Sequence, residues 1–225
     1  MVLKGQLTTE ALNRYGEPAA RVHPSSIDHL PVTRGFTEAV AMPMSCTLSG
    51  PNGNLGFWCF EGTREHFDAY FFTSFSPISV LQIRELWIGH ENDRNYEPWE
   101  QTAAGIRGAF EALTKVEDLT IVNCETEPFF ATLGATVDGG ILLPRLQSLT
   151  IYVGCGDLHI LTLIQCAKAR KEHFRPLWEV TVVWGKDLGA GVMQEAESLG
   201  EFVGELFHDF GETPGLIWTG QDDTW

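Results

Sequence analysis

The segment Ile-Arg-Glu-Leu-Trp-Ile at residues 83–88 decides the fold, because its aliphatic pattern returns three more times along the chain. The later copies lie at residues 116–121, 146–151 and 177–182. The central aliphatic residues of the four copies are Leu86, Leu119, Leu149 and Val180, which gives a period of 30–33 residues. A repeat at this spacing indicates stacked structural units, none of which can bury its own apolar face alone.

Each copy is expected to form a strand. Its first, fourth and sixth positions are aliphatic, and side chains alternate between the two faces of a strand. The fourth and sixth positions should therefore face a core, while the third, fifth and seventh face the other way. A helical pattern follows each copy, and strands that alternate with helices over short connections are parallel.

The four expected helices differ in length. The first follows Pro98, and its buried face is made of Trp99, Ile106, Phe110 and Leu113. The second is a short helix at residues 128–133, closed by Gly134. The third covers residues 158–169, with Asp157 as its N-cap and with basic residues near its end: Lys168, Arg170 and Lys171. The fourth carries an apolar stripe of Leu199, Phe202, Val203, Leu206 and Phe210.

A β-hairpin is expected ahead of the repeats. Met44, Cys46 and Leu48 alternate with polar residues, residues 49–54 are rich in turn formers, and residues 55–60 form an apolar strand. The domain organisation predicted from these patterns has three parts. Residues 1–30 form a loose arm, residues 31–212 form one repeat domain (hairpin cap 31–77, strand–helix repeats 78–212), and residues 213–225 form an acidic tail. Residues 64–76 are expected to be a short helix or a loop packed beneath the first repeat strand.

A resemblance to a known family rests on three segments: Leu-Ser-Gly-Pro-Asn-Gly-Asn-Leu-Gly-Phe-Trp (48–58), residues 74–89 and residues 143–157. Together they resemble the C-terminal region of fungal F-box proteins with leucine-rich-repeat-like sequences. The resemblance implies an α/β leucine-rich-repeat-like solenoid of about four strand–helix units with parallel strands, preceded by the β-hairpin cap. It also implies a substrate-recognition surface of a ubiquitin ligase receptor. No F-box is visible before the hairpin, so docking of the ligase adaptor is not expected from these residues.

Composition narrows the function further. The net charge is −15, which disfavours nucleic acid and anionic membranes as partners because phosphate binding requires clustered Lys and Arg. The five cysteines form no Cys-x-x-Cys pair, and a reducing cytoplasmic or nuclear location is expected. The N-terminus lacks a signal peptide pattern, and no run of apolar residues is long enough for a membrane span.

The candidate binding surface is the sheet face opposite the core. Its third positions form an acidic series, its fifth positions are mostly threonine, and its seventh positions are mixed. The proposed partner-binding residues are Glu85, Trp87, Asp118, Thr120, Val122, Ser148, Thr150, Tyr152, Glu179, Thr181 and Val183. A basic segment of a partner protein would complement this face.

Chemical motifs are weaker. The turn at residues 154–159 (Gly-Cys-Gly-Asp-Leu-His) follows a strand and opens a helix, as a dinucleotide-binding turn does, but His159 stands where the third glycine is required. The seven histidines form no metal set in sequence, and no catalytic signature is present. On the last expected helix, like charges recur every four residues, which fits a solvated end or a contact for a basic partner: Glu197, Glu201, Glu205 and Asp209.

These observations predict a non-enzymatic protein-interaction module without a metal or cofactor. Two alternatives remain open at this point. One is a small-molecule- or nucleotide-binding α/β enzyme that uses the turn from Gly154 to His159. The other is a truncated relic without a partner.

Overall fold

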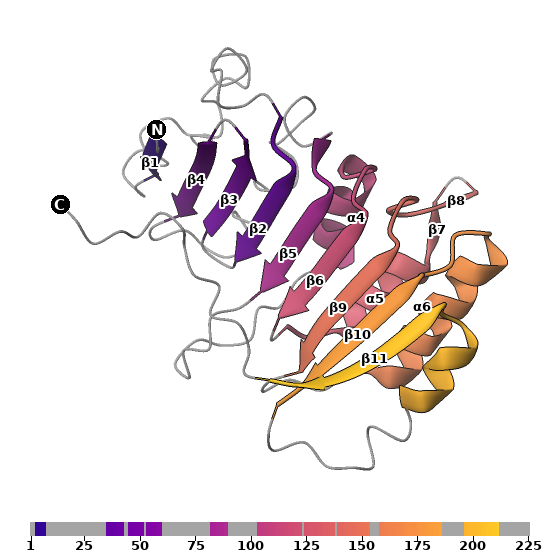
Figure 1. The fold of residues 1–225 in the computed structure, drawn as a ribbon. Helices are drawn as coiled ribbons and strands as arrows, with labels where there is room; N and C mark the ends of the chain where they lie inside the picture. Colours follow the sequence, from indigo (N-terminus) through magenta and orange to yellow (C-terminus); the bar gives the residue numbers. More distant parts are fainter. Residues whose placement is uncertain are drawn as a thin grey trace.

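The computed structural model describes residues 3–7, 35–42, 45–51, 53–59, 82–89, 103–122, 124–137, 139–153, 158–185 and 196–211. They form a mixed α/β fold around a nine-stranded sheet with the order β1-β4-β3-β2-β5-β6-β9-β10-β11 (Figure 1). A separate two-stranded hairpin consists of β7 (Thr136–Val137) and β8 (Gly140–Ile141).

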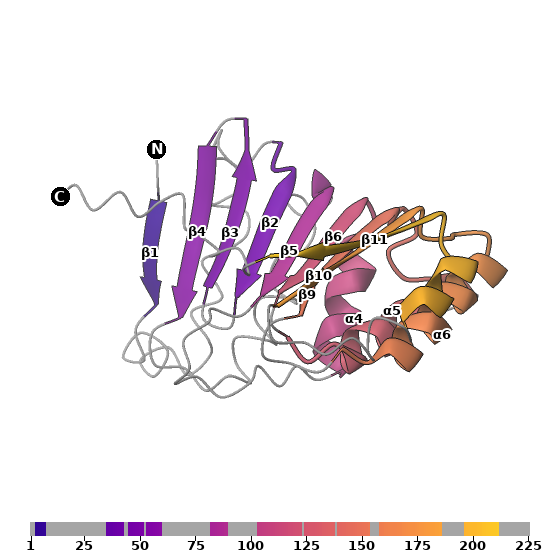
Figure 2. The ribbon, with the colours of Figure 1, turned by 60° about the horizontal axis from the view of Figure 1, so that its bottom comes forward.

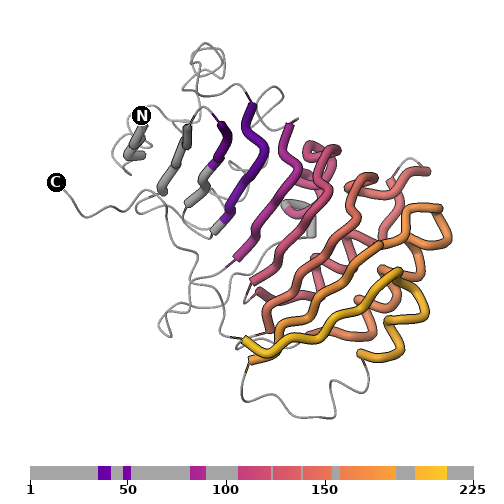
Figure 3. The backbone as a smooth tube through the Cα atoms, viewed as in Figure 1, coloured from indigo at the N-terminus to yellow at the C-terminus, as the bar shows by residue number. Residues whose placement is uncertain are grey.

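The four sequence copies form four neighbouring parallel strands, as predicted (Figure 3). They are β5 (Glu85–Gly89), β6 (Asp118–Val122), β9 (Ser148–Val153) and β10 (Glu179–Trp184). Their register aligns equivalent positions, because Leu86 pairs with Leu119, Leu119 with Leu149 and Leu149 with Val180. These four side chains are all buried in the core.

The helices cover one face of this parallel region (Figure 2). They are α4 (Ala103–Ala112), α5 (Glu127–Gly134) and α6 (Ile160–Glu172). Ile106 and Phe110 of α4 are buried, as the helical pattern predicted, and Phe110 packs against Phe129 of α5. One apolar core therefore lies between the sheet and a single layer of helices.

The predicted hairpin is present as β3 (Ser45–Gly50) and β4 (Gly53–Cys59). It does not adjoin the first repeat strand, because β2 (Glu38–Met42) lies between β3 and β5 and pairs in parallel with β5. β2 was not predicted. Nor was β1 (Leu3–Leu7), which lies within the expected loose arm and pairs in parallel with β4.

The prediction of a fourth helix was wrong. Its residues form a short 3₁₀ helix, η4 (Glu197–Glu201), followed by β11 (Glu205–Phe210), which pairs in parallel with β10. Gly200 and Gly204 weaken a continuous helix here, because glycine lowers helix propensity by about 1 kcal/mol per residue. The expected four-residue acidic ladder on a helix face therefore does not exist.

The third helix was predicted nearly correctly. It begins two residues later than expected, and its N-cap residue is His159, whose side chain makes no capping hydrogen bond. Arg170 and Lys171 do lie in its last turn. Arg170 is fully buried, whereas the Lys171 ammonium donates a 2.8 Å hydrogen bond to the backbone carbonyl of Glu201 in η4.

The same backbone linkage recurs where each strand begins. The carbonyl oxygen of Thr37 accepts hydrogen bonds from the amides of Arg84 and Glu85, at 2.7 and 3.0 Å. The carbonyls of Arg84, Glu117 and Gln147 each accept two amides of the following strand in the same way. At the β10–β11 junction the two hydrogen bonds go to two different carbonyls. The amide of Gly204 donates to the carbonyl of Leu177, and the amide of Glu205 donates to that of Trp178.

Several predicted features lie outside the described residues. They are the arm beyond β1, the segment at 64–76, Pro98 and Trp99, the Asp157 cap and the acidic tail at 213–225.

Candidate functional site

The third positions of neighbouring strands form a row of acidic side chains. Glu38 pairs with Glu85, Glu85 with Asp118, Asp118 with Ser148, Ser148 with Glu179, and Glu179 with Glu205. We call this set the acidic row: Glu38, Glu85, Asp118, Glu179 and Glu205, with Ser148 in its middle. The row is longer than the sequence predicted, because β2 and β11 each add a glutamate. Adjacent strands lie about 4.8 Å apart, so the row spans roughly 24 Å.

Side chains of the fifth positions lie beside the acidic row on the same face. The indole Nε1 of Trp87 donates a 2.7 Å hydrogen bond to Glu85 Oε1. The hydroxyl of Thr181 lies 3.4 Å from Glu179 Oε1 and donates a weaker hydrogen bond to it. Two of the carboxylates are therefore oriented by neighbours two residues along their own strands.

The predicted binding face is accessible only in part. Thr120, Val122 and Val183 are buried, with relative exposures of 8%, 0% and 7%. The other eight predicted residues, at the third and fifth positions and at Tyr152, are half-buried or exposed. The accessible residues therefore include the whole acidic row. The threonine residues at the fifth positions do not form a continuous accessible series, because Thr120 is buried. Three of the eleven predicted residues are thus buried in the face that was expected to be exposed.

The acidic row is electrostatically unfavourable to the fold. Partial burial, followed by repulsion from Glu85, raises the pKa of Glu38 above its ordinary value. Partial burial also raises the pKa of Asp118, with smaller contributions from Glu85, Glu117 and Glu179. Both causes disfavour the ionised carboxylate, and like charges on adjacent strands repel.

Replacing Asp118 with asparagine should therefore stabilise the protein at pH 7. The gain should be at most about 0.5 kcal/mol, because the side chain is still largely exposed and solvent screens its charge. The folded state binds the Asp118 proton more tightly than the unfolded state, so ionisation lowers stability as pH rises above the ordinary value of 3.8. The gain should disappear below that pH. Urea unfolding of Asp118→Asn and of a control, Glu172→Gln, at several pH values measures it. A variant less stable than wild type at pH 7 would contradict this account.

The turn with the dinucleotide-like pattern is described only at its end. Gly154 to Asp157 lie outside the described residues, and His159 is half-buried directly before α6. Glu179, the acid expected about twenty residues later for such a turn, lies in the acidic row on β10. The described part of the turn therefore adds no support for nucleotide binding.

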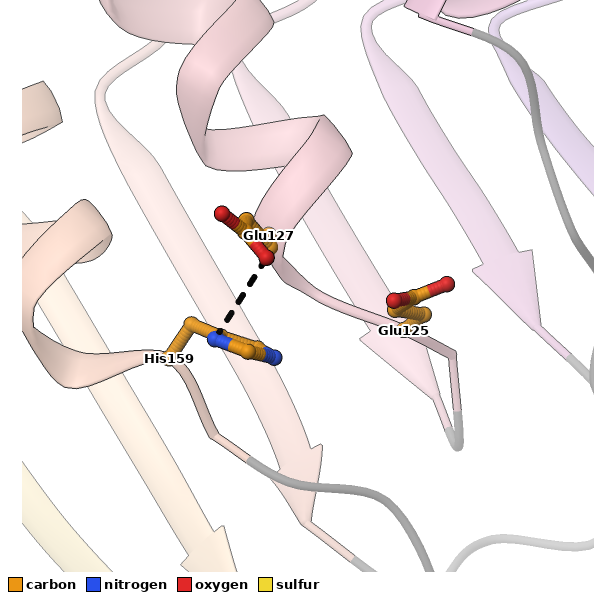
Figure 4. A group of neighbouring side chains, drawn as sticks. All are labelled: Glu125, Glu127 and His159. Carbon is orange, nitrogen blue, oxygen red and sulfur yellow. Dashed lines mark ion pairs between the residues drawn. The ribbon is translucent and has the colours of Figure 1, made fainter.

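A second polar cluster was not predicted. Glu125, Glu127 and His159 come from the segments that follow β6 and β9 (Figure 4). The His159 Nδ1 atom lies 3.7 Å from Glu127 Oε2. The sequence could have indicated this cluster. Both segments follow strands that were predicted to be adjacent and parallel, and the carboxyl ends of such strands lie at the same edge of the sheet.

The two cysteines with described side chains are not nucleophile candidates. Burial raises the pKa of Cys124 and that of Cys166 to about 12, so both thiols are protonated at neutral pH. The Cys124 Sγ lies 3.3 Å from the carbonyl oxygen of Val122 and 3.9 Å from that of Ile88 in the neighbouring strand. Cys124 therefore connects two units of the sheet.

Comparison with known proteins provides no information about the site. No protein-family model matches the chain, and no curated protein or solved structure is significantly similar to it. Within the described part of the chain, no helix has both the length and the apolar character needed to cross a membrane.

Proposed function

We propose that this chain is a non-enzymatic protein-interaction module, built as a leucine-rich-repeat-like solenoid, that binds a basic segment of a partner protein along the acidic row. The resemblance to fungal F-box proteins supports the same class, because it implies a substrate-recognition surface made of repeats. Membership of a ubiquitin ligase is not part of the proposal, since it depends on an F-box.

The repeated backbone linkage supports the solenoid. Thr37, Arg84, Glu117 and Gln147 occupy equivalent positions and use their carbonyls in the same way. Each unit is thus joined to the next by the same contacts, which is the property that defines a repeat array. The position of Cys124 agrees with this, because a leucine-rich repeat carries asparagine or cysteine at that place, where it bonds backbone between units.

The observation that carries the binding proposal is the alignment of five carboxylates in the acidic row. Nothing in strand pairing requires an acid at this position, because Ser148 occupies it in β9. Repulsion along the row opposes folding, so retaining the carboxylates makes physical sense where a cationic partner neutralises them.

The dimensions indicate the kind of segment that fits. An extended peptide rises about 3.3 Å per residue, so seven or eight residues cover the roughly 24 Å of the row. Lys and Arg side chains are long enough to reach carboxylates on neighbouring strands from such a peptide. Trp87 lies beside Glu85 and provides a ring face for a cation or for the aliphatic part of a lysine.

A titration with a labelled octapeptide rich in lysine tests the proposal, with anisotropy and Trp fluorescence as readouts. The same peptide with every lysine acetylated is the control ligand. We expect saturable binding of the charged peptide only, weakening between about 50 and 300 mM salt.

Two matched triple variants separate the acidic row from general net charge. The row variant is Glu85→Gln, Asp118→Asn and Glu179→Gln. The control variant is Glu111→Gln, Glu172→Gln and Glu197→Gln, which removes three exposed carboxylates from α4, α6 and η4. We expect the row variant to weaken binding about tenfold or more and the control by less than about threefold. Equal losses in both variants would show that only net charge matters, and the proposal would fail.

A further inference from the structure

The cluster of Glu125, Glu127 and His159 lies at the carboxyl edge of the parallel sheet. Glu125 and Glu127 follow β6, and His159 precedes α6 on the connection from β9 (Figure 4). These two strands are hydrogen-bonded neighbours. Ligand sites of parallel α/β sheets form at this edge, because the connections from adjacent strands converge there.

The three side chains are placed close enough to share one ion. One ligand atom from each lies within 4.8 Å of the others. A tetrahedral ion with bonds of about 2.0–2.1 Å to nitrogen and oxygen places its ligand atoms roughly 3.4 Å apart. The 3.7 Å between His159 Nδ1 and Glu127 Oε2 is already near this value, so small side-chain rotations complete the arrangement.

The backbone holds the two segments together. The amide of His159 donates a 3.2 Å hydrogen bond to the hydroxyl of Thr126, which lies between the two glutamates in sequence. Thr126 is 4% exposed, so this linkage is inside the protein, whereas the three candidate ligands are at the surface. The ligand positions are therefore fixed by the fold across 33 residues of sequence.

Charge and donor type indicate which ion fits. The negative charge of the two carboxylates exceeds the partial positive charge of about one half that the N-terminus of α5 and that of α6 each contribute. The cluster therefore attracts a cation. An imidazole with two carboxylates suits a transition-metal ion such as Zn²⁺ better than Mg²⁺ or Ca²⁺, which prefer oxygen ligands alone. The neighbouring Cys124 side chain is buried, and its Sγ lies 3.3 Å from the carbonyl oxygen of Val122.

We infer that Glu125, Glu127 and His159 form a surface site for a divalent transition-metal ion of the Zn²⁺ type. The site leaves coordination positions open to water, because all three ligands come from one side at the protein surface. It is independent of the acidic row, which lies at the opposite, N-terminal ends of the strands.

Titration of the whole chain with Zn²⁺, followed by calorimetry, and with Co²⁺, followed by visible absorption, tests the site. We expect one ion per chain at this cluster and a rise in Tm with Zn²⁺ through preferential binding to the folded state. His159→Gln and Glu127→Gln should each weaken binding about tenfold or more. The matched controls His173→Gln and Glu172→Gln, at the other end of α6, should bind as wild type does.

Three results would overturn the inference. They are no saturable binding by wild type, wild-type affinity in both ligand variants, or stabilisation by Ca²⁺ but not by Zn²⁺. Absence of saturable binding would mean that His159 and Glu127 form only an ion pair. Wild-type affinity in both ligand variants would mean that the metal binds elsewhere on the chain. Urea unfolding without metal verifies that each variant is folded, and use of two ligand variants keeps the test valid if one is not.

Discussion

Replacing Arg170 with methionine is expected to lower the free energy of unfolding by about 3 kcal/mol, the largest effect we expect from a single substitution. The Arg170 side chain is fully buried, and its Nη atoms donate hydrogen bonds to backbone carbonyl oxygens, whereas its Nε atom has no hydrogen-bond partner among the described residues. Its Nη1 donates to the carbonyl of Leu142 and its Nη2 to that of Leu143, each at 2.9 Å, with Leu146 more distant at 3.4 Å. Methionine fills the space but removes both guanidinium donors, so that the carbonyl of Leu143 keeps only its 3.0 Å hydrogen bond from the amide of Leu146.

The loss of stability should be large because the backbone carbonyls stay buried when the Arg170 guanidinium is removed. Replacing both partners of a buried ion pair by apolar residues is often neutral, but backbone carbonyls remain whatever side chain is present. Leu143 also has a φ of 45°, a conformation that L residues adopt at an energetic cost, and Arg170 holds it in place. Burial lowers the pKa of Arg170, which shows that the folded environment opposes its charge and that hydrogen bonds must offset this.

Urea unfolding of Arg170→Met, Arg170→Lys and Lys168→Met measures the contribution. Lysine can satisfy one carbonyl but not both, so we expect a loss of about 1.5–2 kcal/mol for Arg170→Lys. Lys168 is exposed on the same helix, and its replacement should change stability by less than about 0.5 kcal/mol. A loss in Arg170→Met no larger than in Lys168→Met would mean that the buried hydrogen bonds contribute nothing.

The parallel strands could be predicted because each copy carries the same alternation. Leu86 and its equivalents fall at one position of a strand whose neighbours repeat it, so register follows from the pattern. β2 was missed because Ala39 and Ala41 replace the large aliphatic residues of the other copies, although its register with β5 is the same. β11 was predicted as a helix because its apolar spacing also fits one, although the glycines at 200 and 204 disfavour a continuous helix.

The sites depended on contacts that sequence patterns do not encode. Arg170 bonds carbonyls 24 to 28 residues away, and any residue supplies a carbonyl. His159 meets the segment at Glu127 only because β6 and β9 are neighbours, which can be deduced after the topology is known. The burial of Val122 and Val183 on the outer face was equally unpredictable, since strand alternation says which way a side chain points but not what covers it.

Replacing Gly204 with alanine should destabilise the β10–β11 junction by about 1–3 kcal/mol. A Cβ atom on Gly204 would lie 2.6 Å from the carbonyl oxygen of Trp178, a backbone atom that cannot rotate away. The same oxygen accepts the 2.7 Å hydrogen bond from the amide of Glu205 that starts β11. Alanine therefore forces β11 away from β10 at the point where their pairing begins.

Gly200 provides a matched control four residues earlier. A Cβ atom there would meet nothing within 4 Å, so Gly200→Ala should change stability by less than about 0.5 kcal/mol. Urea midpoints compare the two variants, and hydrogen exchange locates the effect. Amides of β11 should lose protection in Gly204→Ala while those of β6 and β9 keep theirs. Equal midpoints for the two alanine variants would show that the junction adapts without loss.

The same substitution connects stability with the proposed binding face. Glu205 is the last member of the acidic row, and it is aligned with Glu179 only while β11 pairs with β10. Gly204→Ala should therefore weaken peptide binding modestly, by the contribution of one carboxylate, even though it adds no charge and removes none. Because the proposed metal site lies at the carboxyl ends of β6 and β9, whereas Gly204 precedes the start of β11, the metal titration of Gly204→Ala should match that of wild type.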